Sequence, residues 1–259
     1  MTRFLLRLVF VLALPLVLLG LWWLASDDST NPFWPPLRTI LTAFPDVWTP
    51  ERLRADVLPS ILRLAAGYAV AAVVGVALGT VIGSYRRVRA LCEPVLEFLR
   101  AIPAPVLIPV IMLFAGIDDT MKITVIASGC VWPILLNTVE GVRAVDPVMA
   151  ETARSYGITG AARLRNVVLR SASPQIFAGL RQALSIAIIL MVISEMFAAS
   201  NGLGFTIVQF QRGFAIPDMW TGILVLGLLG FVLSVVFQLV ERRVLGWYHG
   251  LRASARRSQ

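Results

Sequence analysis

The amino-acid sequence predicts an all-α integral membrane protein with six transmembrane helices. Of its 259 residues, 58% are hydrophobic and only 15% are charged, whereas soluble domains are about half apolar and about a quarter charged. The apolar residues come in blocks, and a helix of about 20 apolar residues crosses the hydrocarbon core of a bilayer. The basic residues lie mostly between these blocks. These features exclude a soluble domain and predict that the chain is embedded in a lipid bilayer.

The first apolar block, Leu8–Ala25, follows Arg3 and Arg7. A cleaved signal peptide is the competing interpretation, but its apolar region would be about 7–15 residues long and would end at a small-residue cleavage site. This block is longer, and Trp22 and Trp23 near its end are typical of a membrane interface. We therefore expect an uncleaved first span.

The second span is expected at Ile61–Gly83, after a polar loop at residues 27–60 that is rich in proline and tryptophan. Within this loop, Pro36–Trp48 is expected to form a short helix on the membrane surface. The span itself is full of small residues, and Gly75 and Gly79 form a GxxxG step. Such a step lets two helix backbones approach closely, so we expect this span to pack against another helix.

The third apolar segment, Ile102–Gly116, is short and contains Pro103, Pro105 and Pro109. Because proline lacks a backbone N–H, this helix should begin late, or be kinked and buried among its neighbours. The last three spans are expected at Met121–Val139, Ile176–Ala198 and Met219–Val240.

The distribution of Lys and Arg predicts the orientation of these spans. With the N-terminus inside, 17 of the 23 basic residues fall in cytoplasmic segments and 6 fall outside, which is the usual positive-inside asymmetry. Both termini are therefore expected in the cytoplasm. Arg63 and Lys122 lie near the outer face, where they could attract an anion, although extension toward the lipid headgroups is the competing interpretation. Nucleic-acid binding is not expected, because its basic residues would lie on a soluble module with interleaved aromatic residues.

The sequence lacks the motifs of a catalytic site or of a built-in energy source. There is no GxxxxGKS or GxxxxGKT loop to hold ATP phosphates, and the only histidine, His249, lies in the basic tail. Cys92 and Cys130 lie far apart in or beside apolar segments, where a thiol packs as a small hydrophobe. We therefore expect no enzymatic activity, bound cofactor or metal in this chain.

The polar segment at residues 146–174 is predicted to fold on the cytoplasmic side. Asp146 can cap a helix that begins at Pro147. Gly157 can end that helix in a left-handed conformation, and Thr159 can cap a second one. The pattern predicts two short amphipathic helices with a bend between them, and a hairpin lying on the membrane surface is the competing interpretation.

The run Glu151-Thr152-Ala153, followed by Gly157, resembles the EAA-x3-G signature of permease subunits of binding-protein-dependent ABC importers. The chain has Thr152 where alanine is usual, and Leu169-Arg170 where a Leu-Pro pair is usual. The next proline is Pro174, so the second helix is expected to run on farther. The resemblance covers residues 55–248, and several stretches are similar to the nitrate/sulfonate/taurine branch: Phe98–Pro109, Gly116–Ile123, Pro133–Asp146, Glu195 with Gly202-Leu203-Gly204, and Glu241–Trp247.

The resemblance implies the fold of a type I ABC importer permease, with a cytoplasmic coupling helix that docks in a groove on a separate ATP-binding subunit. ATP and Mg would be bound by that subunit. The implied contact residues are Glu151, Ala153, Arg154, Tyr156, Gly157 and Thr159, although a solvated charge is the competing interpretation for Arg154.

The resemblance further implies an extracytoplasmic solute-binding protein, a second permease chain that we expect to be an identical copy, and a location in the bacterial inner membrane. A small solute, expected to be an anion such as a sulfonate, taurine or nitrate, would move inward by alternating access. Polar residues on the fourth and fifth spans are candidates for the translocation path, with hydrogen bonding between helices as the competing interpretation: Ser128, Asn137, Gln182, Ser185, Ser194 and Glu195.

These expectations divide the chain into an N-terminal helix and external loop at residues 1–60, a permease core at 61–241 and a basic tail at 242–259. Two other functional classes stay open. A secondary carrier or channel that needs no ATPase would predict inverted repeats and charges at mid-membrane depth. A membrane scaffold without transport activity would leave the EAA-like segment unexplained.

Overall fold

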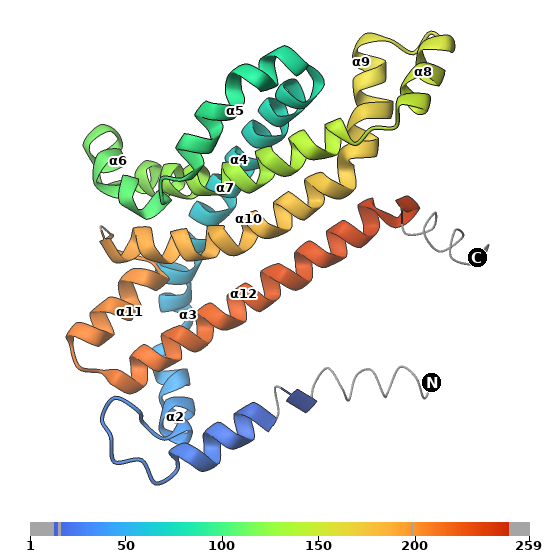
Figure 1. The fold of residues 1–259 in the computed structure, drawn as a ribbon. Coiled ribbons are helices and arrows are strands. Elements are labelled where there is room, and N and C mark those ends of the chain that lie inside the picture. The colour runs from blue at the N-terminus through green and yellow to red at the C-terminus, as the bar shows by residue number, and fades with distance from the viewer. Residues whose placement is uncertain (1–12, 15–16, 198, 249–259) are drawn as a thin grey trace, which may run out of the picture.

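The computed structural model describes residues 13–14, 17–197 and 199–248. The regular elements in these ranges are helices, and the longest of them run as tilted rods between the two ends of the molecule (Figure 1). Helix Val17–Ser26 comes first. It is followed by α2 (Leu37–Val47), α3 (Pro50–Arg52), the π-helical turn η1 (Leu53–Val57), α4 (Leu58–Ser84), α5 (Arg86–Arg100), the 3₁₀ turn η2 (Ala104–Leu107), α6 (Ile108–Ala115), α7 (Asp119–Arg143), α8 (Pro147–Ser155), α9 (Gly160–Arg163), the π-helical turn η3 (Leu164–Val168), α10 (Leu169–Phe197), α11 (Leu203–Arg212) and α12 (Ile216–Val244).

Four helical segments of the described chain are long and apolar enough to cross a membrane. They match the expected second, fourth, fifth and sixth spans. Helix Val17–Ser26 belongs to the expected first span, Leu8–Ala25, most of whose earlier residues lie outside the described ranges. The four segments are Pro50–Ser84, Asp119–Arg143, Gly160–Phe197 and Ile216–Val244.

The third predicted span is not a single helix confined to Ile102–Gly116. Helix α6 begins only at Ile108, and together with η2 it forms a pair with α5 that is bent by 81° at the break between them. Pro103 caps the turn η2 without a backbone donor, and Pro109 occupies the start of α6. The late start and kink are therefore confirmed. The correction is that α5 supplies the other limb, so that the pair rather than α6 alone could cross the membrane as one broken span.

Helices α4 and α7 pack closely against each other along a row of glycines. A Cβ atom added to Gly75 would lie 2.9 Å from the Cβ of Ile134, and one added to Gly79 would lie 2.7 Å from the Cβ of Thr138. Contacts this short leave no room for a side chain, which confirms the close approach predicted from the GxxxG step. On its other side α7 packs against α10, where the Sγ of the buried Cys130 lies 3.4 Å from the carbonyl oxygen of Ala183.

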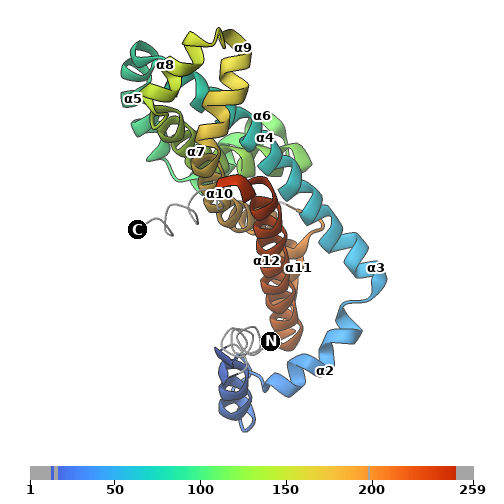
Figure 2. The ribbon, with the colours of Figure 1, turned by 90° about the vertical axis from the view of Figure 1, so that its right-hand side faces the viewer.

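The short helix predicted within Pro36–Trp48 forms as α2 and packs against the beginning of α12 (Figure 2). Trp48, directly after α2, donates from Nε1 to the Oγ1 of Thr221 at 2.9 Å, and both residues are buried. Beside this contact, the rings of Trp22, Trp34 and Trp220 gather with centroids 5.5–5.9 Å apart. These contacts hold the N-terminal segment against the last long helix. They leave most of the apolar surface of α12 uncovered within the described chain.

Candidate functional site

The first helix of the predicted cytoplasmic segment forms as α8, with both of its predicted ends. The Oδ1 of Asp146 accepts a hydrogen bond from the backbone N–H of Val148 at 2.8 Å. At the other end, Gly157 has φ +71° and donates to the carbonyl of Arg154 at 2.9 Å, while Ile158 donates to that of Ala153 at 2.8 Å. These two bonds form a Schellman motif, the common way for a glycine to end a helix.

The second helix of the segment is longer than the short helix that the sequence pattern predicted. It begins at Gly160, directly after Thr159, whose side chain makes no capping hydrogen bond. It then continues through the turn η3 into α10, giving one helical segment from Gly160 to Phe197. The continuation predicted from Leu169-Arg170 is therefore confirmed, because Pro174 lies inside α10 without ending it. The hairpin is joined to a long apolar helix without a loop between them.

The six predicted coupling residues all lie on this hairpin, which projects at one end of the bundle (Figure 1). Ala153 is buried, whereas the other five are exposed. Tyr156 is 81% exposed, and Val148 and Met149 add further exposed apolar surface on α8. The hairpin thus presents an uncovered surface that contains both apolar and charged groups.

A second group of predicted residues lies in a buried polar cluster that joins four helices at the opposite end. The carboxylate of Glu195 on α10 is fully buried. Its Oε1 accepts hydrogen bonds from Ser60 at 2.7 Å and from Arg63 at 3.0 Å, and its Oε2 accepts from the backbone N–H of Gly204 at 2.9 Å. Arg63 also donates to Asp119 at 2.8 Å. The cluster therefore joins α4, α7, α10 and α11.

The extension of Arg63 and Lys122 toward lipid headgroups is wrong. Their exposed fractions are only 4% and 3%. Arg63 turns inward because the buried Glu195 and the exposed Asp119 both offer acceptors, and the Nζ of Lys122 lies 3.6 Å from the same Asp119. The sequence signal for this ion pair was the presence of a basic residue, Arg63, inside one predicted span and of a carboxylate, Glu195, inside another. Burying either charge alone would be costly.

The predicted translocation-path residues fall into separate places. Ser128 and Ser194 donate to carbonyls of their own helices, those of Val125 and Met191, at 2.8 and 2.9 Å. Glu195 lies in the buried cluster, and Ser185 is exposed on α10. The remaining two, Asn137 and Gln182, line one pocket of about 550 Å³ together with Glu97, Arg100, Ala101, Trp132, Pro133, Leu136 and Ile186.

Two charged residues of this pocket were not predicted from the sequence. Glu97 and Arg100 form an ion pair on α5, and the end of α5 that carries them lines the pocket together with residues of α7 and α10. Their spacing of three residues along one helix was the available signal. Among the described residues, no group of three or more His, Cys, Asp or Glu side chains could hold a metal ion.

A solved structure contains a similar arrangement of helices. The chain matches a structure of the MetNI methionine ABC transporter in inward-facing conformations with a TM-score of 0.63 and 20% identity, over 74% of this chain and 95% of that one. The chain therefore shares the fold of a chain of that transporter.

The family model of binding-protein-dependent transport system inner membrane components matches residues 71–246, and the chain belongs to this family. The taurine transport system permease TauC of Escherichia coli is 30% identical, over 90% of this chain and 87% of its own length. The same organism has SsuC, a protein named as an aliphatic sulfonates transport permease. It is 31% identical, over 91% of this chain and 92% of its own length. The bicarbonate transport permease CmpB of Synechococcus elongatus is 30% identical, over 73% of this chain and 68% of its own length. The resemblance found in the sequence is thereby confirmed.

Proposed function

We propose that this chain is the membrane-spanning subunit of an ATP-driven importer that carries a small anion into the cell. The names of three relatives specify taurine, aliphatic sulfonates and bicarbonate, each of which carries a small anionic group. A separate ATP-binding subunit would bind ATP and Mg and would drive the cycle. An extracytoplasmic binding protein would deliver the solute to the outer face.

The continuity of the hairpin with α10 is the observation that carries the coupling proposal. A partner that moved α8 would move a helix that runs from Gly160 to Phe197 without an intervening loop. Such a helix transmits displacement as a rigid body, which is what alternating access by rocking requires. The exposed Tyr156, Met149 and Val148 would enter an apolar groove on the ATPase. Glu151, Arg154 and Thr159 would supply polar contacts beside them, while Ala153 packs within the hairpin.

The pocket around Asn137 and Gln182 supports the location of the pathway. Polar side chains within membrane spans usually face the interior of a bundle or a water-filled cavity. Here Gln182 is exposed on the surface of one chain, so a second copy facing this surface would enclose the cavity. We place the solute path between two identical chains, with Arg100 as the group that attracts an anion. Ser185, one turn from Gln182, would extend the same face.

The proposed setting is the bacterial inner membrane, with six spans in each chain and both termini in the cytoplasm. The excess of basic residues in the predicted inner segments supports this orientation. The hairpin then lies in the cytoplasm, and the cluster around Glu195 lies near the outer face. The expected partners are these proteins and the lipid bilayer, and nucleic acid is not expected to bind.

The test compares two substitutions of similar size at Gly157, co-expressed with the candidate ATPase. Gly157 has φ +71°, and nothing lies within 4 Å of an added Cβ. Asparagine tolerates this conformation, whereas a β-branched valine is strained in it. We expect wild type and Gly157→Asn to co-purify with the ATPase and support ATP hydrolysis. Gly157→Val should lose both while eluting as a folded permease.

A wild-type chain that binds no ATPase would contradict the proposal. Uptake driven by an ion gradient in vesicles without ATP would then favour the secondary carrier. If valine and asparagine behave alike, the geometry of the hairpin is not what the ATPase recognises. Uptake of radiolabelled taurine, an alkyl sulfonate, nitrate and bicarbonate by the full complex would identify the solute.

A further inference from the structure

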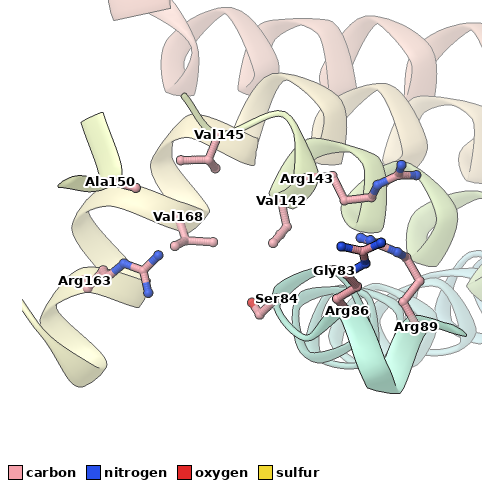
Figure 3. A pocket seen from close by; sticks show the side chains of 10 residues that line it. All are labelled: Gly83, Ser84, Arg86, Arg89, Val142, Arg143, Val145, Ala150, Arg163 and Val168. Carbon is pink, nitrogen blue, oxygen red and sulfur yellow. The ribbon is translucent and has the colours of Figure 1, made fainter. Parts of the chain in front are cut away.

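A second pocket, distinct from that around Asn137, lies between the cytoplasmic hairpin and the ends of two long helices. It has a volume of about 360 Å³. Figure 3 shows Arg163 of α9 on one side of it and Arg86, Arg89 and Arg143 on the other. Gly83, Ser84, Val142, Val145, Ala150 and Val168 form the rest of its lining.

The arginines of this pocket carry positive charge that is mostly uncompensated. Arg143 is paired with Glu140 at 2.6 Å. Among the described residues, no carboxylate lies within ion-pair distance of Arg86, Arg89 or Arg163. The Nε of Arg163 is buried and has no hydrogen-bond partner in the same part of the chain. A buried donor without an acceptor is costly, so the pocket favours an anionic ligand with several acceptor oxygens.

The position of the pocket fits a ligand at the membrane interface. Helix α4 ends at Ser84 and α7 ends at Arg143, and both belong to segments long enough to cross a membrane. The pocket therefore lies where the chain leaves the hydrocarbon core. Val142, Val145 and Val168 give it an apolar side next to the arginines.

We propose that this pocket binds a phosphate group, and that the group belongs to an anionic phospholipid or to free phosphate. Guanidinium groups bind phosphate oxygens through paired N–H donors, and basic pockets between membrane helices on the cytoplasmic side bind anionic headgroups. The bound group would join the elbow between α4 and α5 to the hairpin. The site is separate from the proposed contact with the ATPase, and its occupancy would limit movement of the hairpin.

The test uses the purified full-length chain in detergent. Native mass spectrometry would compare the binding of phosphatidylglycerol and phosphatidylcholine, with and without millimolar inorganic phosphate. The test variant is Arg86→Gln/Arg163→Gln. Its matched control, Arg87→Gln/Arg165→Gln, removes the same charge from neighbouring exposed positions that do not line the pocket. Loss of two phosphate-binding arginines should weaken binding by about tenfold or more.

We expect the wild type and the control to prefer phosphatidylglycerol, and the test variant to lose that preference. Retention of phosphatidylglycerol in millimolar phosphate assigns the site to lipid. Binding of phosphate without a preference between lipids assigns it to a soluble anion. Equal behaviour of the two double variants would overturn the proposal. A wild type that binds neither phosphatidylglycerol nor phosphate would also overturn the proposal. If the test variant nevertheless lost binding to the ATPase, the pocket would be a contact with protein instead.

A second variant covers the case in which the double substitution prevents folding. Ser84→Glu places a carboxylate at an exposed position in the lining, where it would pair with the arginines. It should abolish the lipid or phosphate preference without removing any arginine. If Ser84→Glu binds either anion as the wild type does, the proposal is wrong.

Discussion

The carboxylate of Glu195 on α10 accepts a hydrogen bond at 3.0 Å from the guanidinium of Arg63 on α4, although 132 residues separate them in the chain. Both side chains are buried, and Asp119 of α7 completes the arrangement through a second contact with Arg63. Removing one member of a buried pair leaves an uncompensated charge, whereas removing both members does not. The cluster therefore makes the stability of three helices depend on one another.

Replacing Arg63 alone should be more damaging than replacing both members of the pair. We expect Arg63→Met to lower the free energy of unfolding by about 3–5 kcal/mol, and Arg63→Met/Glu195→Met to recover part of this loss. The measurement is the midpoint of thermal unfolding in detergent, with the exposed Arg87→Met as the control. Additive losses in the double variant would show that the two charges are not coupled.

Gly79 should not tolerate even a methyl group. A Cβ there would lie 2.7 Å from the Cβ of Thr138 and 2.8 Å from the carbonyl oxygen of Leu135, so Gly79→Ala should cost about 1–3 kcal/mol through overpacking. Gly227 on α12 has nothing within 4 Å of an added Cβ. Gly227→Ala should therefore be neutral, or gain up to about 1 kcal/mol from helix propensity. Thermal unfolding of the two alanine variants in one detergent checks this, and equal destabilisation would refute the close α4–α7 contact.

The hydrogen bond between Trp48 and Thr221 should contribute to the attachment of the N-terminal segment. Thr221→Val keeps the shape but leaves the buried Nε1 of Trp48 without its acceptor, which should cost about 1–3 kcal/mol. Thr221→Ser keeps the hydroxyl and should cost less. Limited proteolysis at residues 27–35 would report detachment of α2, and equal cleavage of both variants would count against this role.

The cap at Asp146 should stabilise α8 locally. Asp146→Ala removes the acceptor for the N–H of Val148, and loss of such a cap costs about 1 kcal/mol. Asp146→Asn keeps an acceptor and serves as the matched control. Hydrogen exchange across Val148–Thr152 should quicken in the alanine variant only. Unchanged exchange would mean that contacts with η3 and α10 hold the helix instead.

Arg100 should influence anion uptake without affecting assembly. In the reconstituted complex, Arg100→Gln should lower anion uptake several-fold, because it removes the positive charge from the pocket that holds Asn137 and Gln182 and leaves the carboxylate of Glu97 there without its partner. Arg87→Gln, an exposed position outside that pocket, should not. Co-purification with the ATPase should be unchanged in both variants. Equal uptake by the two variants would place the solute path elsewhere.

Local features of the hairpin could be predicted residue by residue because short-range chemistry determines them. Asp146 caps α8, Gly157 ends it, and the next helix continues past Leu169, where Arg170 takes the place of the usual proline. Each outcome depends on backbone geometry within a few residues. The length of that second helix was underestimated because Thr159 suggested a start without indicating where the helix would stop.

The environments of charged residues could not be predicted in the same way. Extension of Arg63 toward the headgroups was one of two interpretations, because a long basic side chain near the end of an isolated helix extends toward water. Its actual partners come from α7, α10 and the segment before α11. Glu97 and Arg100 were likewise missed, because only the tertiary structure brings them beside Asn137 and Gln182.

The sequence by itself determined the membrane class, four of the long spans, the GxxxG contact face and the ends of α8. These features follow from hydropathy, residue size and backbone preferences, which act over one helix or one turn. Only the tertiary structure decided the bend of the third span, the buried cluster around Glu195 and the arginine pocket beside the hairpin. Each of these depends on which helices lie side by side, and long-range packing sets that arrangement rather than the preference of any single segment.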